Sequence, residues 1–318
     1  MQYYLAPLEG ITRHVYRNAY HKYFRPMDKY FSPFISATQK MNFKHRELLD
    51  VLPANNEATP LIPQILSNQS ETFISAAKVL ADMGYEEVNL NLGCPSRTVV
   101  SKGRGAGCLA EPKKLDQFLE EIFTYWDGKV SIKTRLGMWE PEEWYRLMEI
   151  YNKYPMTELI IHPRLQTDYY KGIPRLEEFG AALATCKHPI CYNGDIFVKE
   201  DLEKLLALYP QVDRIMLGRG VLCNPGLLDT LENGKLPDNK TIQAYLDEVC
   251  DGYAAIFSGE INVLFKMKEL WCYLLFLYPE DAKIAKKIKK ANKLVEYKAA
   301  VQELMSKYEP EGRRFLSV

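Results

Sequence analysis

Short apolar runs rich in β-branched and aromatic residues alternate with longer amphipathic stretches over the first two thirds of the chain. Eight of these runs have the length and composition of strands, at residues 3–6, 29–36, 61–66, 87–92, 129–134, 158–162, 189–193 and 213–217. Strands that alternate with helices form βαβ units, in which the strands are parallel. The pattern therefore predicts an α/β protein.

The stretches between the runs carry helix signals. Residues 70–83 are predicted to form a helix because apolar residues recur along one stripe. This stripe consists of Phe73, Ala77, Leu80 and Ala81. Further helices are expected to begin near Pro112, Pro141 and Lys199. Eight strand–helix repeats predict a (β/α)8 TIM barrel, with a doubly wound open sheet as the alternative, because a count of strands does not prove closure.

The pattern changes after Gly234. Glycine becomes rare, and helical periodicity extends over residues 241–308. The intervening Pro237-Asp238-Asn239 has the composition of a linker. We therefore expect two domains, a barrel over residues 1–236 and a small all-helical C-terminal domain over residues 240–318.

The composition is that of a soluble globular protein, since 47% of the 318 residues are hydrophobic and 26% are charged. The most apolar stretch, residues 270–278, is too short to span a bilayer, and the N-terminus shows no signal peptide. The seven cysteines include no CxxC pair, which argues against a disulfide framework or a zinc site. We expect a cytoplasmic protein with no membrane partner and no metal.

Charge is unevenly distributed, although the formal net charge is zero. Residues 1–60 carry net +3 and residues 260–318 net +4, whereas residues 61–259 carry net −7. Residues 283–293 hold six lysines and no acidic residue. An apolar stripe on this helix is expected to consist of Ile284, Ile288, Ala291 and Val295. The lysines then favour a polyanion partner, with a merely solvated helix face as the alternative.

Candidate functional residues stand at nearly every predicted strand end, where the active sites of such barrels lie. In chain order they are Pro7, Leu8 and Glu9, then Gln64, Asn91, Cys94, Lys133, Arg135, His162, Arg164, Asn193, Gly194, Asp195, Gly218 and Arg219. Glycines after the last two strands let backbone N–H groups approach an anion, and Arg219 adds further donors. These two turns together predict a phosphate site.

Lys133 and Cys94 offer the most specific chemistry. Lys133 would place a positive charge beside a cofactor that gains negative charge, such as a reduced flavin, although a lysine reaching out of the barrel mouth is the alternative. Cys94 lies between Gly93 and Pro95, so the turn presents its thiol. A thiol is mostly protonated near neutral pH and can therefore donate a proton. The other six cysteines are expected to be structural.

These motifs resemble those of the tRNA-dihydrouridine synthases, flavoenzymes that reduce specific uridines in tRNA. The resemblance covers essentially the whole chain and is most specific at Asn91-Leu92-Gly93-Cys94-Pro95, followed by Gly105-Ala106. The C-terminal domain is similar to the tRNA-binding domain of the bacterial subgroup in which that domain is compact. One departure is Pro163, which stands where the family usually has a glycine.

The resemblance implies FMN as the cofactor, NADPH as the reductant and tRNA as the partner. The implied FMN contacts are Pro7, Leu8, Glu9, Gln64, Lys133, His162, Asn193, Gly194, Asp195, Gly218 and Arg219. Cys94 would donate a proton to C5 of a flipped-out uridine as hydride reaches C6. The implied contacts to uridine and tRNA are Asn91, Arg135, Arg164, Tyr170, Lys266, Lys268, Lys286, Lys287 and Lys290.

Two other functions stay open. One is a flavin-dependent barrel that acts on a free pyrimidine, similar to dihydroorotate dehydrogenase, which would not need a lysine-rich helical domain. The other is a non-catalytic protein that binds structured RNA, which would need neither Cys94 nor Lys133 at the rim. The sequence shows no dinucleotide motif and no signal for a protein partner.

Overall fold

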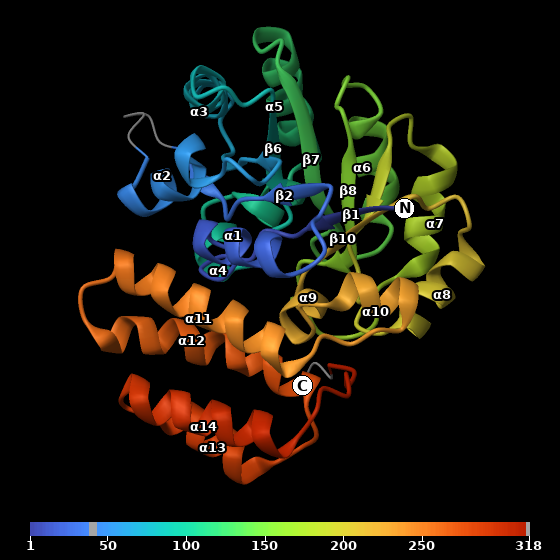
Figure 1. Cartoon of the computed structure of the whole chain (residues 1–318). Helices are drawn as coiled ribbons and strands as arrows, with labels where there is room; N and C mark the ends of the chain where they lie inside the picture. Colours follow the sequence, from blue (N-terminus) through green and yellow to red (C-terminus); the bar gives the residue numbers. More distant parts are fainter. Residues whose placement is uncertain (38–42, 316–318) are drawn as a thin grey trace.

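The computed structural model describes residues 1–37 and 43–315, so the last three residues of the predicted helical domain lie outside the described residues. A barrel of parallel strands is flanked on one side by a group of helices (Figure 1). The strands are β1 (Gln2–Leu5), β2 (Lys29–Phe31), β3 (Ile35–Ser36), β4 (Leu61–Ile62), β5 (Gln64–Leu66), β6 (Glu87–Leu92), β7 (Lys129–Gly137), β8 (Leu159–Leu165), β9 (Ile190–Tyr192) and β10 (Arg214–Leu217).

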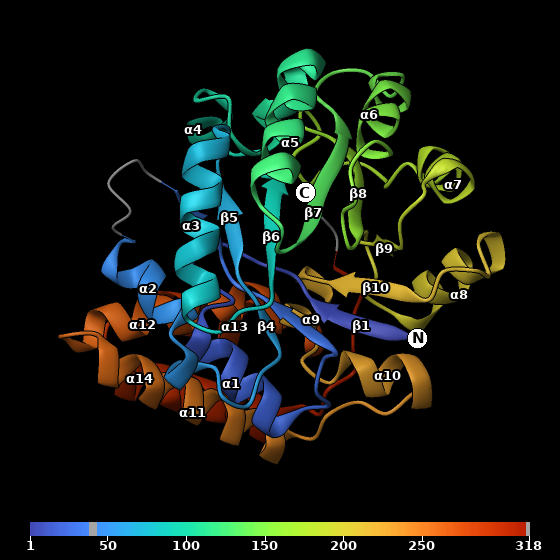
Figure 2. The ribbon, with the colours of Figure 1, turned by 90° about the horizontal axis from the view of Figure 1, so that it is seen from above.

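Helices connect the strands and cover the outside of the barrel (Figure 2). They are α1 (His14–Tyr23), α2 (His45–Val51), η1 (Pro53–Asn55), α3 (Ser70–Asp82), α4 (Arg97–Val100), η2 (Gly105–Ala110), α5 (Pro112–Tyr125), α6 (Glu143–Tyr151), α7 (Leu176–Thr185), α8 (Lys199–Leu208), α9 (Arg219–Cys223) and α10 (Leu227–Asn233). The remaining helices are α11 (Asn239–Ile256), α12 (Glu260–Leu274), η3 (Leu275–Leu277), α13 (Ala282–Lys290) and α14 (Leu294–Lys307).

The ten strand segments occupy eight positions in a closed barrel. β2 and β3 are the two halves of one predicted strand, and β4 and β5 are the halves of the next, with Pro33 and Pro63 in the breaks. β2 pairs with β4 and β3 with β5, and β1 pairs with both β2 and β10. Proline cannot donate to a strand ladder, which explains the interruptions. The TIM-barrel prediction is therefore confirmed, and the open sheet is excluded.

Side chains fill the barrel interior in layers of different polarity. The middle layer is apolar and consists of Tyr4, Ala6, Phe31, Ile62, Ile160, Cys191 and Met216. The layer at the amino ends of the strands is charged, with Glu158 paired to Lys29 and Arg214 and bonded to the Tyr4 hydroxyl. In barrels of this kind that end serves stability, which leaves the opposite, carboxyl end for chemistry.

The predicted helices are present, with two corrections to their faces. The helix predicted over residues 70–83 is α3, which ends one residue earlier at Asp82, and helices α5, α6 and α8 begin within two residues of the predicted starts. Ala81 is exposed, because the face that packs on the barrel is centred on Phe73, Ala77 and Leu80. Val295 is also exposed and is no part of the lysine-rich helix, because α13 ends at Lys290 and a new helix, α14, begins at Leu294.

Helices α11 to α14, here called the helical group, form two layers against the barrel. α11 packs on α1, α12 packs on α9 and α11, and the pair α13–α14 lies beyond them (Figure 1). Aromatic rings fill the α1–α11 contact, where Tyr245 meets Tyr16 at 6.1 Å and Phe24 at 5.2 Å between centroids. Gly252 allows the close approach, because a Cβ there would lie 2.7 Å from Val15 Cγ1. No helix in the described ranges is both long and apolar enough to cross a membrane.

A buried polar network joins α1 to the end of α2. The Asp50 carboxylate accepts from the Arg13 guanidinium at 3.0 Å and from both the backbone N–H and the ring Nδ1 of His14. The neighbouring Arg17 is fully buried and donates to the Asp50 carbonyl and to Asn56 Oδ1. Burial alone would raise the pKa of Asp50, but the bonds from His14 and the charges of both arginines lower it overall.

Removing this carboxylate should destabilise the protein strongly. We expect Asp50→Ala to reduce the free energy of unfolding by about 3–5 kcal/mol at neutral pH, because Arg13 would keep its buried charge without a partner. Urea unfolding followed by circular dichroism measures the change. The exposed Glu57, changed to alanine, is the control and should shift stability by no more than about 0.5 kcal/mol. Equal stability of both variants would contradict a structural role for the network.

Candidate functional site

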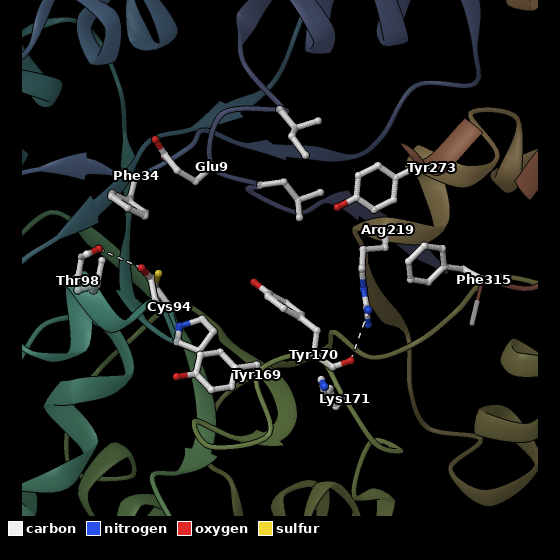
Figure 3. A pocket seen from close by; sticks show the side chains of 15 residues that line it. Glu9, Phe34, Cys94, Thr98, Tyr169, Tyr170, Lys171, Arg219, Tyr273 and Phe315 are labelled. Atoms are coloured by element: carbon white, nitrogen blue, oxygen red, sulfur yellow. Dashed lines mark hydrogen bonds between the residues drawn. The ribbon is translucent and has the colours of Figure 1, made fainter. Parts of the chain in front are cut away.

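A two-chambered cavity opens at the carboxyl ends of the barrel strands, and Figure 3 shows the residues that line its outer chamber. Its outer chamber has a volume of about 690 Å³ and its inner chamber about 110 Å³, and the two share the lining residues Leu8, Glu9, Phe34, Cys94 and Tyr170. The inner chamber is further lined by Pro7, Gln64, Asn91, Lys133, Arg135, His162 and Asn193. The cavity therefore brings together most of the rim residues that the sequence singles out.

Strand alternation explains why residues so far apart in sequence meet here. Successive side chains of a strand point to opposite faces, so residues two apart share a face. His162 follows Ile160 by two positions and Asn193 follows Cys191 by two, and both Ile160 and Cys191 belong to the apolar plug inside the barrel. The inner chamber therefore lies directly above the apolar middle layer, toward the carboxyl ends of the strands.

A chain of amide hydrogen bonds holds the turn that carries Cys94. Gln64 Nε2 donates to Asn89 Oδ1 at 2.8 Å, and Asn91 Nδ2 donates to Gln64 Oε1 at 2.7 Å. Asn91 Oδ1 then accepts from the backbone N–H groups of Gly93 and Cys94 at 3.0 and 2.9 Å. The Asn91 amide thus holds this turn while its side chain also lines the inner chamber, and its contact with the uridine stays a prediction. The chain fixes the direction of the strand exit and hence the place of the thiol.

Three further bonds tie the same turn to other segments. Arg135 Nε donates to the Gly93 carbonyl at 2.8 Å, and the Ala106 N–H donates to the Cys94 carbonyl at 3.1 Å. Gln166, which follows β8, donates from Nε2 to the Pro95 carbonyl at 3.0 Å. Burial raises the pKa of the Cys94 thiol, and a backbone bond at Ser96 and the charge of Arg135 offset only part of this effect. The thiol is therefore protonated at neutral pH.

Pro163 lies inside β8 without breaking it. The pairing of β7 with β8 shifts register between Arg135 and Gly137, opposite the proline. A bulge is one of the few places where a sheet accepts proline, because an N–H is not needed there. The strand continues to Leu165, so His162 and Arg164 keep inward-facing positions despite the departure from the family glycine.

Arg164 is completely buried and organises its neighbours. Its guanidinium forms a bidentate ion pair with Asp195, donates to His162 Nε2 at 3.0 Å, and donates to the carbonyls of Lys171 and Gly172. It lines neither chamber. The predicted direct contact of Arg164 with substrate is therefore replaced by a positioning role, because every donor already has a partner inside the protein.

Asp195 and Arg219 form the next link. Asp195 also accepts from Arg219 Nη2 at 2.6 Å, so two guanidinium groups surround one carboxylate. A carboxylate does not bind phosphate directly, and Asp195 instead orients Arg219 at the edge of the outer chamber. Gly218 precedes Arg219, and a Cβ there would be in ordinary contact with Ala6 Cβ, at 3.4 Å.

Tyr170 projects into the middle of the cavity, between Cys94 and Arg219 (Figure 3). Its ring lies 5.3 Å from the Arg135 guanidinium, 5.2 Å from that of Arg219 and 6.0 Å from the His162 ring. It is 42% exposed, so it is available to a ligand that enters the outer chamber.

Positive groups crowd the inner chamber. Lys133 has no hydrogen-bond or ion-pair partner among the described residues, and burial together with the charge of Arg135 lowers its pKa to about 7. Burial lowers the pKa of Arg135 to about 10. Burial and the charges of Arg135 and Lys133 lower the pKa of His162 well below its usual value, so this ring is neutral and accepts from Arg164. An anionic ligand group would stabilise the charges gathered here.

An anionic flavin nucleotide fits this arrangement. Its phosphate would meet Arg219 at the edge of the outer chamber, near the predicted phosphate turns at Gly194 and Gly218. Its ring system, which is larger than the inner chamber, would reach from the outer chamber toward Lys133. An unpartnered lysine facing a cavity is the feature that argues most strongly for a negative ligand group. Asn193 donates to the Met216 carbonyl at 2.8 Å and so links the turn after β9 to strand β10.

The lysines of the helical group are spread over several surfaces. Lys266 donates to the Gly10 carbonyl at 2.8 Å and pairs with Glu269, so it ties α12 to the loop after β1. Lys287 pairs with Glu303 on α14 at 2.6 Å. Lys286 and Lys290 are exposed on α13, and Lys268 is half-buried on α12. None of these lysines lines either chamber, but Lys266 contacts Gly10, which lies between the outer-chamber residues Glu9 and Ile11.

Several residues that line the cavity or hold its turns were missed in the sequence. Gln166 continues the alternation of His162 and Arg164, so the same two-residue step would have found it. Phe34 follows the Pro33 break within a predicted strand. Tyr273 and Phe315 enter the outer chamber from the C-terminal part of the chain, and no sequence pattern signals that contact.

Comparison with known proteins agrees with these features. A family model described as dihydrouridine synthase (Dus) matches residues 4–311. A probable tRNA-dihydrouridine synthase of Staphylococcus epidermidis is 30% identical over 232 residues, covering 70% of this chain and 69% of that protein. A probable tRNA-dihydrouridine synthase 2 of Bacillus subtilis is 28% identical over 232 residues, with the same coverage of 70% and 69%.

Solved structures show a similar fold. Morphinone reductase superimposes with a TM-score of 0.54 at 13% identity, over 76% of this chain and 88% of that one. Morphinone reductase in complex with tetrahydroNAD gives a TM-score of 0.51 at 12% identity, over 78% and 93% of the two chains. At this level of identity the likeness supports the barrel architecture.

The unpartnered lysine should make the cofactor-free protein less stable. Because the pKa of Lys133 falls to about 7, the unfolded chain binds more protons than the folded one between pH 7 and about 10, and stability rises with pH over that range. We expect Lys133→Met to stabilise cofactor-free protein by roughly 1–3 kcal/mol at pH 6–7, with the gain shrinking toward pH 10. Chemical unfolding at a series of pH values tests this, and a destabilised variant at pH 6 would contradict it.

Proposed function

The chain belongs to the dihydrouridine synthase family and is therefore an enzyme, and we propose that it reduces the C5=C6 bond of a uridine in tRNA with FMN as cofactor and NADPH as reductant. The observation that carries the proposal is the inner chamber, where Cys94 and Lys133 face the same small space. The experiment that tests it compares dihydrouridine in tRNA from cells with and without this gene, together with the colour of the purified protein.

Cys94 is the proton donor in this proposal. When bound, the flavin supplies hydride to C6 of the uracil, and C5 then requires a proton. A general acid must be protonated before the step, and the raised pKa of the Cys94 thiol satisfies this requirement. Asn91, Arg135, Ala106 and Gln166 hold the turn by its backbone, so the thiol keeps its direction while the base is bound.

The basic side chains take up the cofactor's negative charge. Lys133 would gain a partner on binding, which raises its pKa again and makes it a stable positive charge at neutral pH. Neutral His162 contributes ring hydrogen bonds without adding charge. Arg219 would meet the phosphate, while Asp195 and Arg164 maintain its orientation. Pro7, Leu8 and Glu9 would form one wall beside the ring, opposite the Cys94 turn.

The uridine would enter through the outer chamber. A base stacked in folded RNA must be flipped out to reach it, at a cost of a few kcal/mol. Tyr170 and Arg135 stand at the junction of the two chambers and would contact the flipped base. Shape and backbone contacts, rather than base sequence, would guide a folded RNA to the mouth.

The helical group would dock the RNA. In this proposal residues 1–236 perform catalysis and residues 240–318 bind tRNA. The exposed Lys286 and Lys290 lie on α13, separated from the barrel by α11 and α12 (Figure 1). An RNA that reaches both these lysines and the cavity must span that layer, which suits a large folded RNA better than a free pyrimidine.

Cys94→Ala tests the proton donor. The variant should keep flavin and its reduction by NADPH but lose uridine reduction by about 10²–10⁴-fold, because only the acid is removed. Single-turnover assays that follow flavin reduction and dihydrouridine formation separately measure both steps. Cys108→Ala is the matched control, since that thiol bonds to the Gly103 carbonyl and its pKa is raised to about 12 by burial. Uridine reduction at the wild-type rate in Cys94→Ala would rule out the assignment.

Charge reversal tests the docking of RNA. Lys286→Glu combined with Lys290→Glu should weaken tRNA binding for all tRNA sequences. The slope of the logarithm of the binding constant against the logarithm of the salt concentration should become shallower by roughly 0.9 for each phosphate that the protein no longer neutralises. Lys287 is left unchanged, because its reversal would oppose Glu303 and disturb folding. The control reverses the exposed Lys78 and Lys113 on α3 and α5. Identical affinity and salt slope in both double variants would remove α13 from the docking surface.

A further inference from the structure

The segment after α14 returns from the helical group to the barrel mouth. The backbone N–H groups of residues 311–313 donate to the carbonyls of Leu277 and Phe276 at 2.7–3.2 Å. The Arg313 side chain donates to two more carbonyls of the same turn. We call residues 309–315 the return segment. These bonds fix its path along the end of α12, toward the turns that follow β9 and β10.

Phe315 inserts between the helical group and the barrel. Its ring stacks on Phe197, which precedes α8, at 5.5 Å and 25°, and on Tyr273 of α12 at 5.8 Å and 26°. Phe276 packs against it at 4.7 Å. The adjacent Arg314 pairs with Asp201 at the start of α8 at 2.7 Å. One aromatic side chain thus joins three segments at the edge of the cavity.

The same ring covers Arg219. The Arg219 guanidinium lies 5.6 Å from the centroids of both Phe315 and Phe197, and 5.2 Å from that of Tyr170. Its side chain is only 12% exposed, while Asp195 holds its other side. Aromatic faces attract a guanidinium and exclude water from it, which strengthens its interaction with an anion. Phe315 is therefore placed to set both the direction and the hydration of Arg219.

We propose that Phe315 is a positioning residue for the cofactor: it holds Arg219 against the turn after β10 and so increases affinity for a phosphate-bearing flavin. The return segment thereby connects the RNA-docking helices to cofactor binding. The inference rests on the proposed function for the nature of the cofactor, and it adds a residue outside the barrel to the cofactor site. Phe315 itself does not need to touch the flavin.

Affinity for FMN measures this role directly. Cofactor-free protein is titrated with FMN and followed by flavin fluorescence, for wild type, Phe315→Ala, Phe315→Tyr and Arg219→Ala. Phe315→Ala should raise the Kd for FMN roughly 2- to 30-fold, because one cation–π interaction of about 0.5–2 kcal/mol is removed. Phe315→Tyr keeps the ring and should restore the wild-type Kd. Phe265→Ala removes an exposed ring elsewhere on α12 and should leave the Kd unchanged.

The outcomes separate this inference from the proposed function. Wild-type Kd in Phe315→Ala, with FMN binding abolished in Arg219→Ala, would overturn the positioning role and leave the cofactor proposal standing. An equal decrease of affinity and of Tm in both Phe315 variants would also overturn it, because that pattern indicates a purely structural role. A wild-type protein that binds no FMN would refute the cofactor proposal and this inference together.

Discussion

The buried guanidinium of Arg164 is the interaction on which the rest of the site depends. It has no contact with solvent, yet it fixes the tautomer of His162, the position of Asp195 and the backbone at Lys171 and Gly172. Asp195 passes this order on to Arg219, and the held backbone carries the ring of Tyr170 to the middle of the cavity. A rigid planar fork suits this task, because several acceptors in one plane are engaged at fixed angles. A lysine at the same position would leave most of them without a donor.

The cavity combines order with electrostatic strain. Its backbone is restrained by many bonds, whereas Lys133 and Arg135 bring like charges together in the inner chamber. The protein offsets this repulsion by lowering the pKa of its lysine and by keeping His162 neutral. The repulsion in the cofactor-free site lowers the free energy of unfolding, and an anionic ligand bound there would raise it again. This arrangement is common at sites that bind anions. The charged layer at the other end of the barrel shows the opposite pattern, with Glu158 shared between Lys29 and Arg214.

Sequence periodicity was sufficient to predict the barrel and most of the residues that line the inner chamber. Strand alternation is a local rule, so it can be applied to each strand separately. It predicted that Lys133, His162 and Asn193 share a rim, and the structure places all three there. It did not show that the amide of Asn91 is used by the Cys94 turn, or that Arg164 is enclosed, since hydrogen-bond partners depend on neighbouring strands. The position of Phe315 was beyond any local pattern, because it depends on how a distant segment packs. The exposure of Val295 was missed for a simpler reason: one helix ends and another begins before it.

The packing of α11 on α1 has a consequence for how the chain is made. α1 belongs to the first strand–helix unit, but the aromatic face of Tyr16 and Phe24 is covered by Tyr245, more than two hundred residues later. The first strand also waits for β10 to close the ring. During synthesis the earliest part of the barrel thus keeps an apolar face open until nearly the whole chain has left the ribosome.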